Sequence, residues 1–438
     1  MPTPSPRPLE PHRSHRHAKR ASRSIPASVA TWHHDRHARR AEVPIRSMHE
    51  MTPAGFFIWL WGWIKATAFQ WRKAPFPTHR QAPNNAIYTI PDECVIGIAA
   101  DWGSGTAPAL RVAEGIRSLA PDVTIHMGDV YFCGEPEEYE RLFIGEPPGT
   151  DGSWPRGTTR PARPTDALPA YAMNGNHEMC GGGYGIFEHA LPALGQKTSY
   201  FALENAYWRI VALDTGYTTP PNGVMQFFTD FLARISNGLP RANQEWLAQC
   251  VFRDPADKRP VVLLSHHQPL SAFEADYPVL RPQLAPFLDR VLLWFWGHEH
   301  RLALYEPVSL AGGVVRGRCI GHAGMPNPPE FPALSKSPWT SHVVATPPDG
   351  VGVRDPDDGA LYSYCGWITF ELRGRDLCVR YYNEDPVQDS VPFDPPKGPI
   401  LEEVWSVGSD GVCAGRVTKC DGQMLRIWPS HTADDLVR

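Results

Sequence analysis

The sequence predicts an α/β fold for residues 90–385, and three observations support this prediction. Short apolar runs of strand length alternate with stretches of helical periodicity from about residue 90 onward. The runs are continuously apolar, which is typical of strands that are covered on both faces of their sheet. With 438 residues, of which 42% are hydrophobic, the chain is also long enough to bury a large core.

The expected elements follow one another in a β–α order. Strands are predicted at 95–100, 123–127, 171–173, 199–203, 208–213, 261–265 and 291–296. Helices are predicted near 107–118, 136–143, 243–251 and 279–289. We expect the strands 199–203 and 208–213 to form a hairpin, and residues 363–383 to close the fold as antiparallel strands. Two Pro-rich stretches, 145–169 and 323–360, are too long for ordinary connections and are expected to be flaps beside the site or disordered loops.

The segments that flank this α/β region have different compositions. Residues 1–54 are basic and rich in Pro, Arg and His, which predicts a disordered tail. Residues 55–75 have the pattern of an aromatic amphipathic helix, but Lys65 interrupts it too early for a membrane span. Three interpretations stay open: peripheral membrane contact through 55–73, a helix docked on the catalytic domain, or a late-starting signal sequence. Residues 386–438 are a C-terminal extension of unknown role.

The distribution of charge and the cysteines restrict the function classes. Residues 1–50 carry 10 Lys/Arg and 4 Asp/Glu, a charge of +6, so the rest of the chain carries −11 of the total of −5. An acidic body argues against a nucleic-acid partner, because such surfaces need clustered Lys and Arg. The nine cysteines form no C-x-x-C pair and are predicted to be reduced. In the absence of an ordinary signal sequence we expect a cytoplasmic location.

Metal-ligand residue types follow the predicted strands at the points where these end. They are Asp101, Asp129, Asn176, His177, His266, His267, His298 and His300. Because ligands bind outside the carboxyl ends of strands in α/β sheets, we expect these side chains to converge. A carboxylate such as Asp129 can bridge two ions, and imidazole and amide groups complete such sites. The sequence therefore predicts two divalent metal ions (Mn, Zn or Fe), which together attract phosphate.

Five sequence blocks resemble, in their order, those of the calcineurin-like metallophosphoesterases. They are AADWG (99–103), MGDVYF (127–132), NGNHE (174–178), LLSHHQPL (263–270) and WGHEH (296–300). The Asp-x-Gly first block and NQEWL (243–247) are closest in style to the purple acid phosphatase-like branch. The resemblance implies a sandwich of two mixed β-sheets flanked by helices. It also implies hydrolysis of a small phosphorylated substrate, a phosphate mono- or diester, by attack of a metal-bound hydroxide at a dinuclear centre.

The resemblance further implies a role for each site residue. One metal would be held by Asp101, Asp129 and His300, and the other by Asp129, Asn176, His266 and His298. The catalytic residues would be Asp129, which bridges the metals, His177, which faces the substrate and protonates the leaving alkoxide, and Glu178, which orients the His177 ring. The choice between His266 and His267 as ligand stays open, with His266 preferred, because adjacent residues that leave a strand point to opposite sides.

One departure from the purple acid phosphatase-like pattern concerns the metal. In that branch a tyrosine three positions after the second-block Asp binds ferric iron, whereas this position is Phe132 here and the tyrosine is Tyr131. We expect the Tyr131 ring to point elsewhere, which predicts a divalent pair without purple colour. Two alternative functions stay open: a metal-bearing scaffold that no longer hydrolyses, and a nuclease that uses the basic tail.

Overall fold

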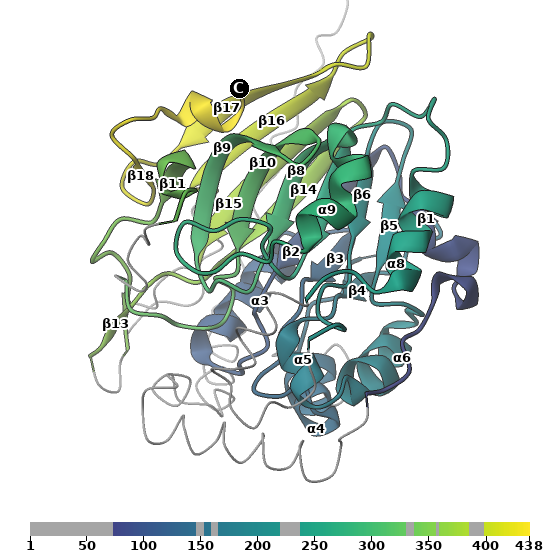
Figure 1. Cartoon of the computed structure of the whole chain (residues 1–438). Helices are drawn as coiled ribbons and strands as arrows, with labels where there is room; N and C mark the ends of the chain where they lie inside the picture. Colours follow the sequence, from purple (N-terminus) through teal and green to yellow (C-terminus); the bar gives the residue numbers. More distant parts are fainter. Residues whose placement is uncertain are drawn as a thin grey trace, which may run out of the picture.

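The computed structural model describes residues 73–145, 153–158, 165–219, 237–329, 337–355, 359–384 and 398–438. In this part of the chain two large mixed β-sheets pack together and helices flank them (Figure 1), so the predicted α/β sandwich is confirmed. The predicted tail, and the predicted helix 55–75 up to residue 72, lie outside the described residues. No helix of the described residues is long and apolar enough to cross a membrane. Peripheral membrane contact and a cytoplasmic location stay predictions.

The first sheet has nine strands. Their order across the sheet is β1 (Ile87–Thr89), β5 (Phe201–Glu204), β6 (Arg209–Ala212), β7 (Val261–Ser265), β8 (Val291–Trp296), β10 (Gly313–Ile320), β9 (Leu302–Leu310), β11 (Val343–Thr346) and β18 (Arg426–Ile427). Strands β6, β7, β8 and β10 are parallel, and β5 and β6 form the predicted antiparallel hairpin. The carboxyl ends of β7 and β8 therefore lie at the same edge of this sheet.

The second sheet has seven strands. Their order is β17 (Cys413–Cys420), β16 (Leu401–Val407), β15 (Asp376–Asn383), β14 (Gly366–Arg373), β2 (Glu93–Ala99), β3 (Val123–His126) and β4 (Ala170–Ala172). Strands β2, β3 and β4 are parallel, so their carboxyl ends also share one edge. The antiparallel pair β14 and β15 occupies the predicted segment 363–383. A separate short hairpin joins β12 (Val353–Arg354) and β13 (Leu361–Tyr362).

The continuous apolar runs are explained by burial on both faces of each sheet. In β8, Leu293 and Phe295 pack in the core between the two sheets, whereas Trp294 and Trp296 pack in the core on the outer face. That outer core includes side chains of α8 (Arg241–Trp246), η6 (Leu247–Val251), α9 (Leu280–Leu284) and η7 (Ala285–Arg290). The outer face of the seven-stranded sheet packs against α3 (Ala107–Ser118), η4 (Tyr139–Ile144), η5 (Gly185–Ala190) and α6 (Leu191–Leu194). Neither face of a central strand meets water, so the sequence does not alternate.

The C-terminal segment belongs to both sheets. Strands β16 and β17 extend the seven-stranded sheet, and β18 pairs with β11 in the nine-stranded sheet. A fully buried ion pair also joins the two sheets, because Arg318 of β10 donates to both carboxylate oxygens of Glu403 of β16 at 2.9 Å. Residues 398–438, for which the sequence predicted no role, thus form part of the sandwich.

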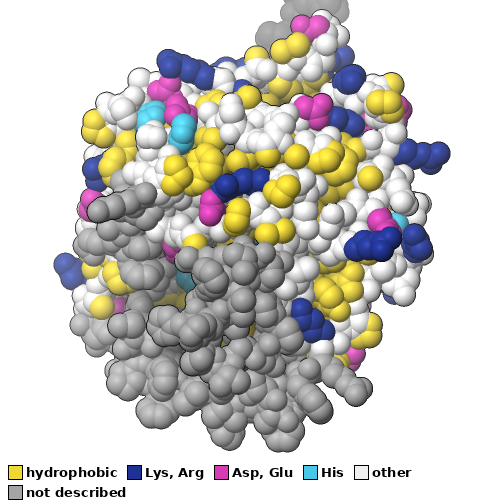
Figure 2. Space-filling model, in the orientation of Figure 1, with side chains coloured by type: hydrophobic (Ala, Val, Ile, Leu, Met, Phe, Trp, Pro, Cys, Tyr) yellow, Lys and Arg dark blue, Asp and Glu magenta, His cyan; other side chains and the backbone are white. Residues whose placement is uncertain are grey.

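On the face of the molecule shown in Figure 2, the Lys and Arg side chains of the described residues are dispersed and separated by hydrophobic and uncharged surface. A phosphate-backbone partner requires clustered positive charge. The nuclease interpretation rests on the basic tail, which lies outside the described residues, and it stays untested.

Candidate metal centre

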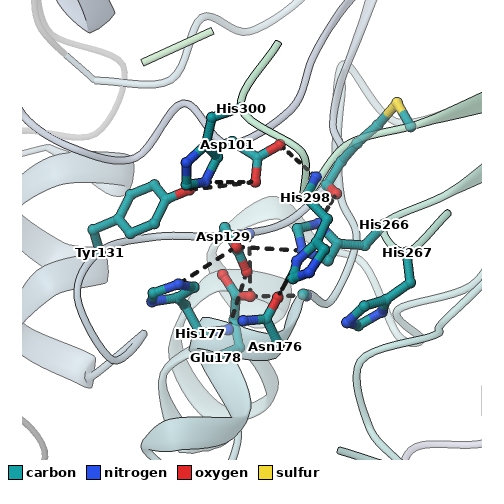
Figure 3. Close-up of polar contacts among 12 residues, drawn as sticks. Asp101, Asp129, Tyr131, Asn176, His177, Glu178, His266, His267, His298 and His300 are labelled. Carbon is teal, nitrogen blue, oxygen red and sulfur yellow. Dashed lines mark hydrogen bonds and ion pairs between the residues drawn. The ribbon is translucent and has the colours of Figure 1, made fainter. Parts of the chain in front are cut away.

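The residues that follow five parallel strands meet where the carboxyl ends of the two sheets face each other. Asp101 follows β2, Asp129 follows β3, and Asn176 begins the short helix α5 (Asn176–Cys180) after β4. His266 follows β7 and His298 follows β8. Figure 3 shows their side chains pointing toward one another. The convergence that the strand ends predicted is thus present in the structure.

One group of donor atoms surrounds the amide oxygen of Asn176. Its Oδ1 lies 3.0 Å from Nε2 of His266 and 2.8 Å from Nδ1 of His298. Nδ1 of His266 lies 3.0 Å from the carbonyl oxygen of Met127, so Nδ1 carries a proton. Nε2 is therefore the ring nitrogen that can bind a metal ion. Nε2 of His266 also lies 3.3 Å from Oδ2 of Asp129. A carboxylate, an amide oxygen and two imidazole nitrogens therefore face one point.

A second group lies on the other side of Asp129 (Figure 3). Nε2 of His300 is 3.7 Å from Oδ1 of Asp101 and 2.8 Å from the hydroxyl of Tyr131. The Tyr131 hydroxyl also donates to Oδ1 of Asp101 at 3.3 Å. The ligand atoms of Asp101, Asp129 and His266 all lie within 4.8 Å of one another, so the two groups adjoin.

The backbone around these side chains is strained and closely packed. Asp101, Asp129 and His298 have positive φ angles of 60°, 70° and 66°, a conformation that non-glycine residues rarely adopt. Glycines make room for the carboxylates: a Cβ at Gly175 would lie 2.1 Å from Oδ1 of Asp129, and one at Gly297 would lie 2.6 Å from Oδ2 of Asp101. The loops after the strands are therefore built to hold these carboxylates in place.

Burial and neighbouring charges shift the pKa values of the central groups. Burial raises the pKa of Asp101 well above its ordinary value. Burial acts in the same direction on Asp129, but the imidazoles of His266 and His177 outweigh it and hold the pKa of Asp129 well below its ordinary value. Burial lowers the pKa of His266, whereas the Asp129 and Asp101 carboxylates outweigh it and raise this pKa to about 10. Asp129 is therefore ionised, as a metal-binding carboxylate must be.

Comparison with known proteins agrees with this geometry. Residues 95–302 match the family described as calcineurin-like phosphoesterase. This segment belongs to the calcineurin-like phosphoesterase family. It contains all the strands and loops that carry the two groups of donor atoms, and we refer to it as the phosphoesterase domain. No curated protein matches the chain.

Several solved structures resemble the chain weakly. Purple acid phosphatase PPD1 from yellow lupin (Lupinus luteus) seeds is 14% identical with a TM-score of 0.40, over 69% of this chain and 53% of that chain. GAP50, the anchor in the inner membrane complex of Plasmodium, is 11% identical with a TM-score of 0.40, over 70% and 90%. A dimetal phosphatase from Danio rerio is 12% identical with a TM-score of 0.37, over 69% and 99%. This chain thus spans about half of the lupin phosphatase, and likeness at this level says nothing about activity.

The prediction for Tyr131 is wrong. We expected its ring to point away from the site of the phosphoesterase domain, but its hydroxyl contacts Asp101 and His300. The expectation rested on the tyrosine being one residue early, but residues 131–133 form a turn after the positive φ of Asp129, and in this turn the Tyr131 side chain faces the site. Burial, together with the charges of Asp101 and Asp129, raises the pKa of Tyr131 well above its ordinary value, so the hydroxyl is a neutral donor. The argument for an exclusively divalent pair relied on a ring that points elsewhere, and it no longer holds because the hydroxyl lies beside Asp101 and His300.

The predicted role of Glu178 is also wrong in its detail. Glu178 is fully buried and accepts hydrogen bonds from the backbone N–H groups of Asp129, Val130 and Gly175, and from the hydroxyl of Tyr139. The His177 ring instead contacts the carbonyl oxygen of Phe132 through Nδ1, at 2.6 Å. The prediction failed because Glu178 faces the loop backbone behind His177. Glu178 therefore positions the Asp129 loop of the phosphoesterase domain.

The structure distinguishes His266 from His267. Nε2 of His266 is directed at Asp129 and Asn176, as described above. Nδ1 of His267 lies 3.0 Å from Oγ1 of Thr215, and its ring stands beside those of Tyr277 and His298, with centroid distances of 4.4 Å and 4.8 Å. One ring nitrogen each of His266, His267 and His298 nevertheless lie within 4.8 Å of one another. His266 has the donor geometry of a ligand, and His267 lines the wall behind it.

Sequence reasoning missed two further contacts to the predicted ligands. The Tyr277 hydroxyl lies 3.0 Å from Nε2 of His298, which fixes this ring with Nδ1 toward Asn176. The backbone N–H of His298 donates to Oδ2 of Asp101 at 2.8 Å. Glu299 lies between the two histidines in sequence, but its carboxylate accepts hydrogen bonds from Ser271 and Trp296, away from the site. Tyr277 lies in an irregular segment with no motif, so no sequence signal identified it.

Proposed function

We propose that this protein is a phosphoesterase that hydrolyses phosphate mono- or diesters at a dinuclear metal centre. The family supports metal-dependent hydrolysis of phosphoesters. The observation that carries the dinuclear proposal is that two groups of donor atoms adjoin at the carboxylate of Asp129. A carboxylate that lies between two sets of metal-ligand atoms can bind one metal ion with each set and so bridge the two ions.

The residues present fit two cations. Oδ2 of Asp129 is fully buried and accepts no hydrogen bond from the described residues. On one side, Oδ1 of Asn176 lies 3.0 Å from Nε2 of His266, and a bound cation would take the place of the Nε2 proton between these two atoms. A cation would satisfy all of these atoms. The first ion would be held by Asp101, Asp129, His300 and, as a further ligand, Tyr131; the second would be held by Asp129, Asn176, His266 and His298.

When bound, two such ions (Mn, Zn or Fe) would act as Lewis acids that offset the negative charge developing on the phosphate. The donor set of imidazole, carboxylate and amide groups suits these metals.

His177 is the residue that this chain offers for proton transfer. Its Nδ1 is 2.6 Å from the carbonyl oxygen of Phe132, which places the permanent proton on Nδ1 and leaves Nε2 to carry the transferable one. Nε2 lies 3.9 Å from Oδ2 of Asp129, and the side chain keeps 13% of its surface exposed. His177 can therefore reach both the shared carboxylate and an incoming substrate. Its role is to donate a proton from Nε2 to the leaving oxygen.

The proposal is tested by hydrolysis with metal-free protein to which Mn, Zn or Fe(II) is added back. The substrates are an aryl phosphate monoester and the matching bis-aryl diester, whose ratio assigns the subclass. Asn176→Ala removes a ligand, and Gln423→Ala, an exposed amide outside the site, is the control. We expect metal-dependent turnover in the wild type and the control and at least a 100-fold loss in Asn176→Ala. Metal binding without turnover on either ester would contradict the proposal and favour the scaffold alternative.

A further inference from the structure

A pair of thiols lies directly behind the proposed catalytic residues. The thiols of Cys133 and Cys180 lie close enough for each to shift the pKa of the other, and both cysteines are free. All nine cysteines belong to the described part of the chain, and all of them are free. Cys133 is fully buried, whereas Cys180 is partly exposed. The pair thus consists of one buried and one partly exposed residue.

The backbone already brings the two cysteines together. The N–H of Gly181, directly after Cys180, donates to the carbonyl oxygen of Cys133 at 3.0 Å. Cys180 also packs against the apolar cluster of Tyr131, Phe132, Cys133 and Met325. Because the two residues are already neighbours, only their sulfur atoms have to move to reach the ~2.05 Å length of a disulfide bond. Small local movements are therefore sufficient.

Both cysteines are attached to segments that carry site residues. Cys133 follows Tyr131, whose hydroxyl contacts Asp101 and His300, and Phe132, whose carbonyl oxygen holds His177. Cys180 is the last residue of α5, the helix that begins with Asn176 and His177. Any covalent bond between the two sulfurs pulls these two segments together. The Phe132 carbonyl oxygen, which contacts the His177 ring, then moves relative to that ring.

We propose that Cys133 and Cys180 are a redox modification site, at which an intramolecular disulfide forms reversibly and switches off the proposed phosphoesterase activity. The two thiols lose two electrons and two protons as the sulfur–sulfur bond forms. The oxidant is a low-molecular-mass disulfide, which is reduced to two thiols in the exchange. Cys180, the partly exposed residue of the pair, forms the mixed disulfide first and releases one thiol, and Cys133 then displaces the second thiol. The effect on activity rests on the proposed function, whereas the disulfide itself does not.

The test uses the full-length zinc-loaded protein treated with oxidised glutathione, because Zn²⁺ has no redox chemistry of its own. Tryptic digestion without reductant separates residues 118–141, which contain Cys133, from residues 157–197, which contain Cys180. We expect these two peptides to be recovered as one cross-linked species. A displacement of about 1 Å at a catalytic group can cost on the order of 100-fold in rate. We therefore expect activity to fall at least 10-fold on oxidation and to return with dithiothreitol.

Two variants complete the experiment. Cys180→Ala, at the partly exposed position, is expected to keep its activity through oxidation and to give no cross-link. Cys250→Ala removes another partly exposed thiol outside the pair and is expected to behave as the wild type. The proposal is overturned if oxidation fails to join the two peptides, or if they join and activity is unchanged. If the reduced protein is inactive, the proposed function fails, and the peptide map alone decides whether the pair forms a disulfide.

Discussion

The substitution Glu403→Ala examines how the segment beyond the phosphoesterase domain contributes to the fold. Glu403 and Arg318 are both fully buried, and the carboxylate also accepts from the Tyr381 hydroxyl at 2.8 Å and the Trp405 indole at 3.2 Å. Removing the carboxylate leaves the guanidinium of Arg318 without a countercharge. Loss of one partner of a buried ion pair costs about 3–5 kcal/mol. We therefore expect the free energy of unfolding to fall by that amount.

The neighbouring residue Glu402 provides the matched control. Glu402 pairs with Arg380 between β15 and β16, and each side chain keeps 22% of its surface exposed. Exposed ion pairs contribute only about 0–1 kcal/mol, so Glu402→Ala should cost little. Equilibrium unfolding in guanidinium chloride, followed by tryptophan fluorescence, measures both variants. The double variant Arg318→Met/Glu403→Leu should recover most of the loss. Equal, small effects of Glu402→Ala and Glu403→Ala would refute the view that this ion pair fastens the C-terminal strands to the nine-stranded sheet.

Three further substitutions probe the site and its surroundings. Gly297→Ala would place a Cβ 2.6 Å from Oδ2 of Asp101, so we expect the metal affinity measured by calorimetry to fall at least 10-fold. Gly422→Ala is the control, because a Cβ there would have no atom within 4 Å, and it should leave the metal affinity unchanged. Tyr131→Phe should abolish the visible phenolate-to-iron absorption that we expect after loading the wild type with Fe(III); a spectrum unchanged by the substitution would show that Tyr131 is no ligand. Burial lowers the pKa of His126 to about 3, and the unfolded chain therefore binds a proton below about pH 6.5 that the folded chain does not. This uptake of a proton by the unfolded chain lowers the free energy of unfolding by about 2 kcal/mol between pH 7 and pH 5. His126→Phe should remove this loss. An equal pH dependence of the unfolding free energy in both proteins would show that His126 does not contribute.

The apolar strands and the polar residues that follow them were predictable because both are local in sequence. Val261–Ser265 is a continuous apolar run, and the fold covers both of its faces. The sites at the strand ends then follow from one geometric rule, that the carboxyl ends of parallel strands share an edge. This rule brought Asp101 and His298 together across about 200 residues of sequence.

Other features were not predictable because they depend on partners that are distant in sequence or on an irregular backbone. Arg318 and Glu403 are polar residues inside strands, and only their mutual contact makes their burial acceptable. The hairpin of β9 and β10 and the strands β16 and β17 contain such polar positions, which interrupt the apolar pattern. Glu178 was misassigned because its partners are backbone N–H groups, which no side-chain pattern encodes.

The number of metal ions that each chain binds tests the dinuclear proposal most directly. Metal-free protein is saturated with Zn²⁺, freed of excess metal, and analysed by elemental analysis together with its protein concentration. We predict two ions per chain in the wild type, one in Asn176→Ala, and strongly reduced binding at both positions in Asp129→Ala, because both sets of donors share only Asp129. A wild-type stoichiometry of one, or two ions retained in Asp129→Ala, would contradict the account.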